Sequence, residues 1–137
     1  MNILVDTNIL LDATLHRDGL YDSSQNAILF ALSNSHHLFF SCSSVTDYYY
    51  LLRKNKFSKE YSLECIKTIA KYASFATVDD KCIYHALHSS INDFEDAVVD
   101  AVATSINADI ILTRNKKDFI NSINKVLTPE EYLQKYQ

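Results

Sequence analysis

The sequence predicts an α/β fold built around a mostly parallel sheet. Short apolar runs alternate with longer amphipathic segments, and no hairpin turn signal joins two of the runs. Gly and Pro occur once each among 137 residues, whereas all-β folds need many tight turns. Because 47% of the residues are hydrophobic and the length suits one core, we expect a single domain over residues 1–137.

The predicted strands are apolar runs too short to form helices, which is typical of strands buried on both faces of a sheet. They lie at residues 3–5, 38–40, 75–78, 110–112 and 126–127. The first run ends at Asp6 and the fourth ends at Thr113. The last run is the shortest, so we expect it at the edge of the sheet.

The predicted helices carry apolar residues at helical spacing, and several follow residues that cap helices well. They lie at residues 9–15, 23–34, 45–55, 59–70, 79–88 and 93–107, and a final helix begins at residue 129. Ser43 and Ser44 are expected to cap the third helix, and Pro129 suits the first turn of the last. Residues 115–119 are expected to form a loop or a single turn.

Charge and cysteine content restrict the classes of function. The formal net charge of −4 argues against a simple electrostatic nucleic-acid binder, but not against an enzyme that holds phosphates through bound cations. The three cysteines are far apart in the sequence, which favours reduced thiols over a disulfide framework or zinc site. No apolar run approaches the ~20 residues that cross a bilayer, and the first residues do not resemble a signal peptide. A cytoplasmic protein without a membrane partner is therefore expected.

Polar residues follow two of the predicted strands. In an open parallel sheet, ligands bind at the carboxyl ends of the strands, near the point where the strand order reverses. If the strands at 3–5 and 110–112 are neighbours, Asp6 and Asn115 face the same crevice.

A third contribution comes from the helix at 93–107. Asp93, Asp96 and Asp100 are spaced so that they lie on one face of this helix. Asp93 and Glu95 suit the start of any helix, and we favour that simple role for both. Asp100 lies in the second turn, beyond the capping positions, so the acidic side chain there needs another explanation. Clustered carboxylates raise one another's pKa unless a cation compensates, and oxygen ligands suit Mg²⁺ or Mn²⁺.

Three motifs together resemble the PIN domain family, most closely the bacterial toxins of VapBC-type toxin–antitoxin modules. They are the triplet at 6–8, the segment at 93–97 that opens a helix, and the segment at 113–119. The resemblance spans nearly the whole chain. It implies a Rossmann-like three-layer sandwich with about five strands. It also implies Mg²⁺- or Mn²⁺-dependent cleavage of RNA, a homodimer and a small cognate antitoxin.

The resemblance also implies roles for single residues. Asp6 is the first metal ligand, supported by Asn8 of the same triplet, and Asp96 is the second. Asn115 lies where the family places Asp or Asn, and Asp118 completes its motif. Thr113 is expected to hydrogen-bond to Asp6 and to orient it.

One position departs from the family pattern. Many members carry a further glutamate early in the helix after the second strand, and here the equivalent position is near Tyr49. Asp47 or Asp100 is the candidate replacement. The alternative is a PIN-like module that binds RNA or a partner protein without turnover.

Basic residues adjoin the predicted site. Arg114, Lys116 and Lys117 are candidates for binding RNA phosphates, with a solvated surface as the simpler interpretation. Arg114 is also suited to pair with a carboxylate. For the run of tyrosines at 48–50 and for the histidines, we favour packing and ordinary surface roles.

Overall fold

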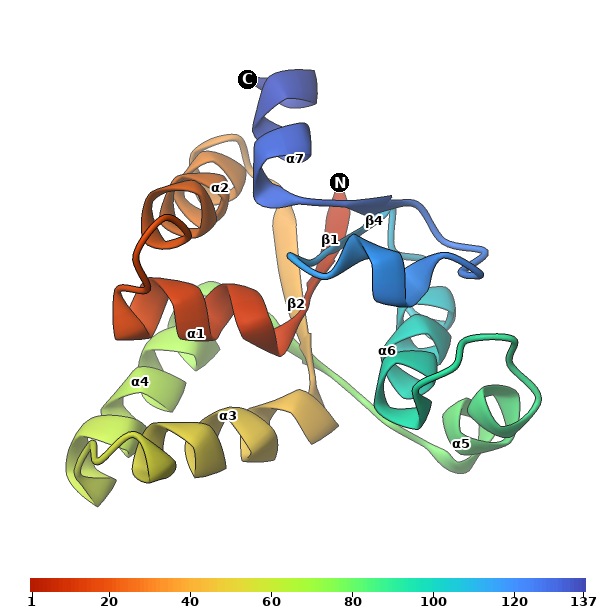
Figure 1. Ribbon diagram of the computed structural model, residues 1–137, viewed down its shortest axis with the longest axis horizontal. Coiled ribbons are helices and arrows are strands. Elements are labelled where there is room, and N and C mark those ends of the chain that lie inside the picture. The colour runs from red at the N-terminus through yellow and green to blue at the C-terminus, as the bar shows by residue number, and fades with distance from the viewer.

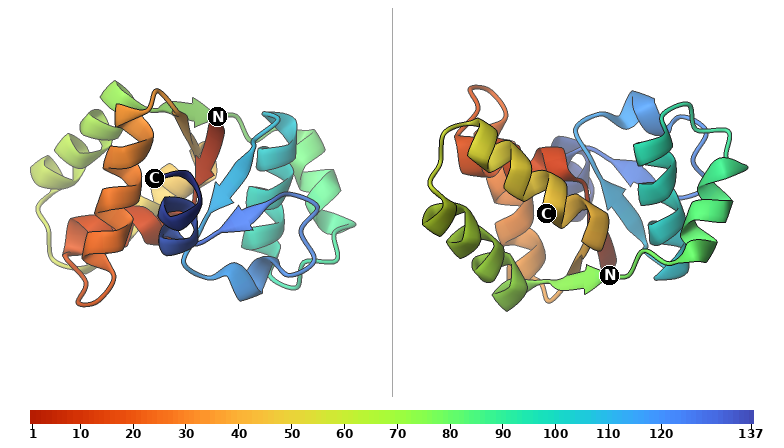
Figure 2. Two further views of the ribbon diagram at one scale, coloured as in Figure 1. Left: turned by 90° about the horizontal axis from the view of Figure 1, so that it is seen from above. Right: turned by 90° about the horizontal axis from the view of Figure 1, so that it is seen from below.

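The computed structural model describes residues 1–137 and contains one sheet of five strands between two layers of helices (Figures 1 and 2). The strands are β1 (Asn2–Val5), β2 (His37–Ser41), β3 (Ser74–Ala76), β4 (Ile110–Leu112) and β5 (Val126–Leu127). Their order across the sheet is β3-β2-β1-β4-β5, and every neighbouring pair is parallel. The predicted fold class is confirmed, and the expected short strand lies at one edge.

Seven α-helices and one 3₁₀ turn connect the strands. They are α1 (Thr7–Leu15), α2 (Tyr21–Ser33), α3 (Cys42–Lys54), α4 (Lys59–Tyr72), α5 (Asp80–Leu87), α6 (Phe94–Ser105), η1 (Lys116–Phe119) and α7 (Pro129–Tyr136). None of the helices is both long enough and apolar enough to cross a membrane.

The central strands divide the apolar core into two parts, because successive side chains of a strand point to opposite faces of the sheet. Ile3 and Val5 of β1 belong to the core covered by α1, α2, α3 and α7, and Leu4 belongs to the core covered by α5 and α6. All three side chains are at most 1% exposed. This burial on both faces explains why β1 has no alternating polar residues.

The order of the strands creates one switch point. From β1 the chain moves outward through β2 to β3 at one edge, and then returns across the sheet through α5 and α6 to β4 on the other side of β1 (Figure 1). Helices on the two faces of the sheet therefore diverge at the carboxyl ends of β1 and β4. A crevice at this place is where parallel α/β sheets bind ligands.

The start of α3 differs from the prediction. The helix begins at Cys42 with Ser41 as its N-cap, so Ser43 and Ser44 lie within the first turn. Ser41 is also the last residue of β2, and the chain turns directly from strand to helix without a loop. The Ser41 and Ser43 hydroxyls hydrogen-bond to each other at 2.7 Å. The preference of serine for helix N-caps does not predict this contact.

Candidate active site

Asp6 is held by a dense set of hydrogen bonds at the carboxyl end of β1. Its Oδ1 accepts from the Thr7 backbone N–H at 2.8 Å, and its Oδ2 accepts from the Asn8 amide at 2.9 Å and the Thr113 hydroxyl at 2.7 Å. Asp6 is 9% exposed. Burial raises the pKa of its carboxyl, although the hydrogen bonds from Thr113, Thr7 and Asn8 favour the charged form. The carboxylate therefore has a fixed orientation.

The segment after β4 completes this arrangement. The Asn115 backbone N–H donates to the Thr113 hydroxyl oxygen at 3.1 Å, and the Arg114 N–H donates to Asn8 Oδ1 at 3.2 Å. These contacts join the ends of β1 and β4, which are neighbours in the sheet. Thr113 is fully buried and Asn115 is partly exposed, so Asn115 lies at the rim of the crevice.

Asp96, in the first turn of α6, lies among other acids of the site. Burial, followed by the negative charges of Asp6, Asp93, Asp118 and Glu95, raises the pKa of Asp96 to about 7. The effect of Asp6 shows that carboxylates 90 residues apart in the sequence meet at this edge of the sheet. No basic residue appears among the causes for Asp96, whereas the positive charge of Arg114 lowers the pKa of Asp6.

Glu95 and Asp47 are further members of the acid cluster. Burial and the charges of Asp47, Asp93 and Asp6 raise the pKa of Glu95. Asp47 belongs to the second turn of α3, so this part of α3 lies close to the start of α6. Sequence reasoning assigned Glu95 only a helix-start role, and nothing in the sequence beyond its place in the 93–97 motif distinguished it.

The acid cluster offers oxygen donors to a metal ion. No three His, Cys, Asp or Glu side chains are grouped closely enough to hold an ion by themselves. Mg²⁺, however, usually takes one or two carboxylates and completes its octahedron with water and phosphate oxygens. Two carboxylates, such as those of Asp6 and Asp96, are the number that such a hard cation usually takes, whereas the residues do not form an all-protein cage.

Asp100 has other partners. It is 3% exposed, its Oδ1 accepts from the Asn124 amide at 2.8 Å, and it also accepts from the Ser122 hydroxyl. Both partners belong to the loop between η1 and β5. Asp100 is not among the charges that act on Asp96, and its contacts tie α6 to this loop.

The three basic candidates have different surroundings. Arg114 Nη1 donates to the buried Asp12 at 2.8 Å, and Lys116 pairs with Glu131 of α7 at 2.9 Å. Lys117 is exposed and forms no ion pair. It lines a polar pocket of about 190 Å³ beside the acid cluster, together with Ile91, Asn92, Asp93, Asp118, Ile120 and Asn121.

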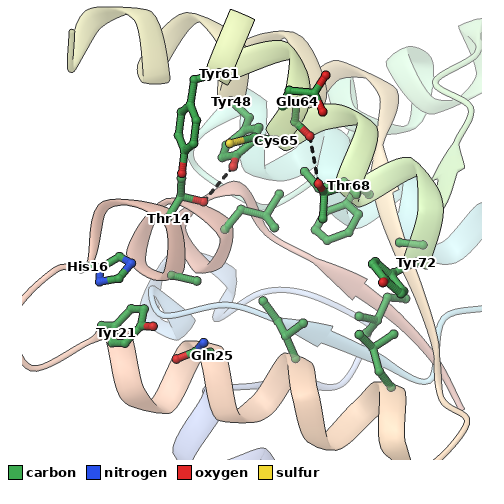
Figure 3. A pocket seen from close by; sticks show the side chains of 18 residues that line it. Thr14, His16, Tyr21, Gln25, Tyr48, Tyr61, Glu64, Cys65, Thr68 and Tyr72 are labelled. Carbon is green, nitrogen blue, oxygen red and sulfur yellow. Dashed lines mark hydrogen bonds between the residues drawn. The ribbon is translucent and has the colours of Figure 1, made fainter. Parts of the chain in front are cut away.

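A larger cavity of about 430 Å³ lies apart from these acids, between α1, α2 and α4 (Figure 3). Most of its lining is apolar, with Leu32 and Ile69 as examples, and the hydroxyls of Thr14 and Tyr48 hydrogen-bond to each other at 2.7 Å in its wall. We place the chemistry at the acid cluster in spite of the difference in size, because this cavity gathers no carboxylates opposite one another.

The fold and the site together define an α/β protein with a carboxylate cluster at the switch point of a parallel sheet. The family model of the PIN domain matches residues 2–117. The chain therefore belongs to the PIN domain family, and the predicted family is confirmed. No curated protein matches the chain.

Solved structures of toxin–antitoxin proteins share the fold at low sequence identity. VapBC2 from Rickettsia felis, bound to a promoter DNA fragment, has a TM-score of 0.74 at 19% identity and covers 93% of this chain and 98% of its own. VapBC-1 from nontypeable Haemophilus influenzae gives 0.70 at 17% identity, covering 95% and 99%. VapC20 from Mycobacterium tuberculosis, a toxin that cleaves the sarcin–ricin loop, gives 0.62 at 14% identity, covering 80% and 86%.

Replacing Asp100 separates a structural from a catalytic role. We expect Asp100→Ala to lower the free energy of unfolding by roughly 2 kcal/mol, because Ser122 and Asn124 lose a charged acceptor in a buried place. Urea denaturation measures the change. Asp18→Ala, at an exposed loop position, is the control and should stay within about 0.5 kcal/mol of wild type. Unchanged stability of the Asp100 variant would contradict this interpretation.

Proposed function

We propose that this protein is a metal-dependent endoribonuclease that acts in the cytoplasm as the toxin of a toxin–antitoxin module. Asp6 and Asp96 are the ligands of Mg²⁺ or Mn²⁺. The observation that carries the proposal is the carboxylate cluster around Asp96, at the switch point of a PIN domain. A hard cation would relieve the mutual repulsion of these acids. The likeness in fold to an RNA-cleaving toxin supports RNA as the substrate.

When bound, such a cation polarises a phosphodiester and generates a nucleophile from water at neutral pH. The residues of the chain have separate tasks. Thr113 and Asn8 keep Asp6 in one orientation, and Asn115 and Asp118 complete the polar surroundings at the rim. Lys117, exposed and unpaired, is the basic residue best placed to bind an RNA phosphate. The products are expected to carry 5′-phosphate and 3′-hydroxyl ends.

Removing one carboxylate charge at a time tests the proposed nuclease activity. We expect Asp6→Asn and Asp96→Asn each to reduce cleavage of labelled RNA in Mn²⁺ by more than the roughly 10- to 100-fold typical of outer-sphere residues. EDTA should abolish cleavage by the wild type. Asp18→Asn, which removes one exposed carboxylate elsewhere, is the matched control and should cleave at the wild-type rate. Wild-type rates in both site variants would sink the assignment.

The second candidate function is a PIN-like module that binds RNA or a partner protein without turnover. The observation that favours it is the residue near Tyr49, where many family members have a glutamate. Incubation of varied RNAs with the pure protein separates the two functions. Metal-dependent products support the enzyme, and retarded but intact RNA supports the module.

A small antitoxin is the proposed protein partner, as in the toxin–antitoxin structures with the same fold. The cavity between α1, α2 and α4 is the surface we assign to it. Its open side carries Tyr61 and Tyr72, which are 50% and 55% exposed although both are large and aromatic (Figure 3). Such a surface suits the apolar face of a partner helix.

A charge placed in this surface tests the docking. We expect Tyr72→Asp to weaken the complex with the proposed antitoxin by roughly 100-fold, because a carboxylate would be buried without a partner. Co-expression and calorimetry measure the affinity. The control is Tyr50→Asp, at a tyrosine of α3 that is 64% exposed and lies outside the cavity. Equal affinities of the two variants would contradict the assigned surface.

We also propose a homodimer, which the resemblance to the PIN domain family predicts. Exposed apolar side chains of α5, namely Ile83, Tyr84 and Leu87, offer a surface that a second copy would cover. We expect light scattering to give twice the mass of one chain, and Leu87→Glu to give the mass of a single chain. A monomeric wild type would exclude the dimer.

A further inference from the structure

Asp12 is a buried acid that the proposed chemistry does not use. It lies within α1, its side chain is 0% exposed, and its position in the helix gives it no capping role. Its Oδ1 accepts hydrogen bonds from Arg114 Nη1 at 2.8 Å and from Arg17 Nη1 at 3.2 Å. Its Oδ2 has no partner. A carboxylate is costly to bury, and the arginines offset this cost, with Arg114 in the closer contact.

The two arginines differ in what else they contact. Arg17 lies in the turn after α1, and its backbone N–H donates to the Asp12 carbonyl at 3.2 Å. Both of its contacts with Asp12 are therefore local in the sequence. Arg114 lies between Thr113 and Asn115, in the segment that arranges the site after β4. Its side chain reaches Asp12 while its backbone N–H donates to Asn8 at 3.2 Å.

Arg114 thus fastens residues 113–115 to α1 at two points. The first point is Asn8, which also donates to Asp6 Oδ2 at 2.9 Å and to the Thr113 hydroxyl at 3.3 Å. The second point is Asp12, one turn further along the same helix. Because Asp6 leads directly into α1, both points act on the helix that starts at the proposed metal ligand.

We propose that the Asp12–Arg114 ion pair is a positioning device for the metal site: it seats residues 113–115 on α1 and thereby keeps Thr113 in hydrogen-bonding contact with Asp6. Arg114 is a positioning residue, and it is not free to bind an RNA phosphate. The effect on catalysis rests on the proposed function, whereas the effect on the segment itself does not.

Arg17 supplies a matched control, because it pairs with the same Asp12 oxygen but has no contact with the Asp6 network. The first measurement compares Arg114→Ala and Arg17→Ala by ¹H–¹⁵N NMR of the metal-free protein. We expect the Asn8 side-chain amide and the Asn115 backbone amide to shift in Arg114→Ala and to stay in place in Arg17→Ala. Equal spectra at these two amides would overturn the proposal, whatever the activity of the protein.

The second measurement is the affinity for Mn²⁺, by calorimetry, together with the kinetics of RNA cleavage. Arg114→Ala should weaken Mn²⁺ binding and lower kcat by about 10- to 100-fold, the usual effect of losing an outer-sphere partner, with little change in KM. Arg17→Ala should leave both within about twofold of wild type. Arg114→Lys should restore part of the loss, since it keeps the charge but not the planar fork. A raised KM with unchanged kcat and Mn²⁺ affinity would instead assign Arg114 to RNA binding and overturn the proposal.

If Arg114→Ala does not fold, Asp12→Asn/Arg114→Gln replaces the ion pair by a neutral hydrogen bond. We expect this double variant to keep the Asn8 and Asn115 resonances near their wild-type positions. Displaced resonances in a folded double variant would overturn the proposal. A wild type that neither binds Mn²⁺ nor cleaves RNA would refute the proposed function alone, since the NMR comparison still decides the role of Arg114.

Discussion

The parallel pairing of β1 with β4 is the constraint on which the site depends. It places Val5 opposite Leu112, so that both strands end at the same level and their next residues emerge side by side. The Asp6 backbone N–H continues the ladder to the Leu112 carbonyl at 2.9 Å. Thr113 is thereby within reach of Asp6 although the two are 107 residues apart. A shift by one residue would turn either side chain to the other face of the sheet.

Acids that are buried or partly buried in this protein are accommodated in three different ways. Asp100 is surrounded by neutral donors, and Asp12 is paired with arginines. Asp96 is partly exposed and has neither, and its partial burial and the charges of other acids raise its pKa to about 7. Charge removed from water is usually compensated, and a strongly shifted pKa without a basic partner is typical of sites that bind ligands. The electrostatics therefore separate the proposed functional acid from the structural ones, which residue type alone does not.

The same contrast applies to the basic residues beside the site. Arg114, Lys116 and Lys117 are close together in the sequence, but only Lys117 is without an acidic partner. The place of Arg114 before the 3₁₀ turn and of the two lysines within it decides this, together with the places of α1 and α7. From their spacing in the sequence, all three residues were equal candidates for binding RNA. Their neighbours in the folded chain distinguish them.

The sequence by itself determined the alternation of buried strands and amphipathic helices, because hydrophobic periodicity is a local property that survives in the folded chain. It also determined that Asp6 and Thr113 follow strands. Only the tertiary structure decided that these two strands are neighbours, that Glu95 faces Asp47, and that Asp12 holds Arg114. Each of these contacts joins residues far apart in the sequence, and their meeting depends on strand order and helix packing, which no local pattern specifies.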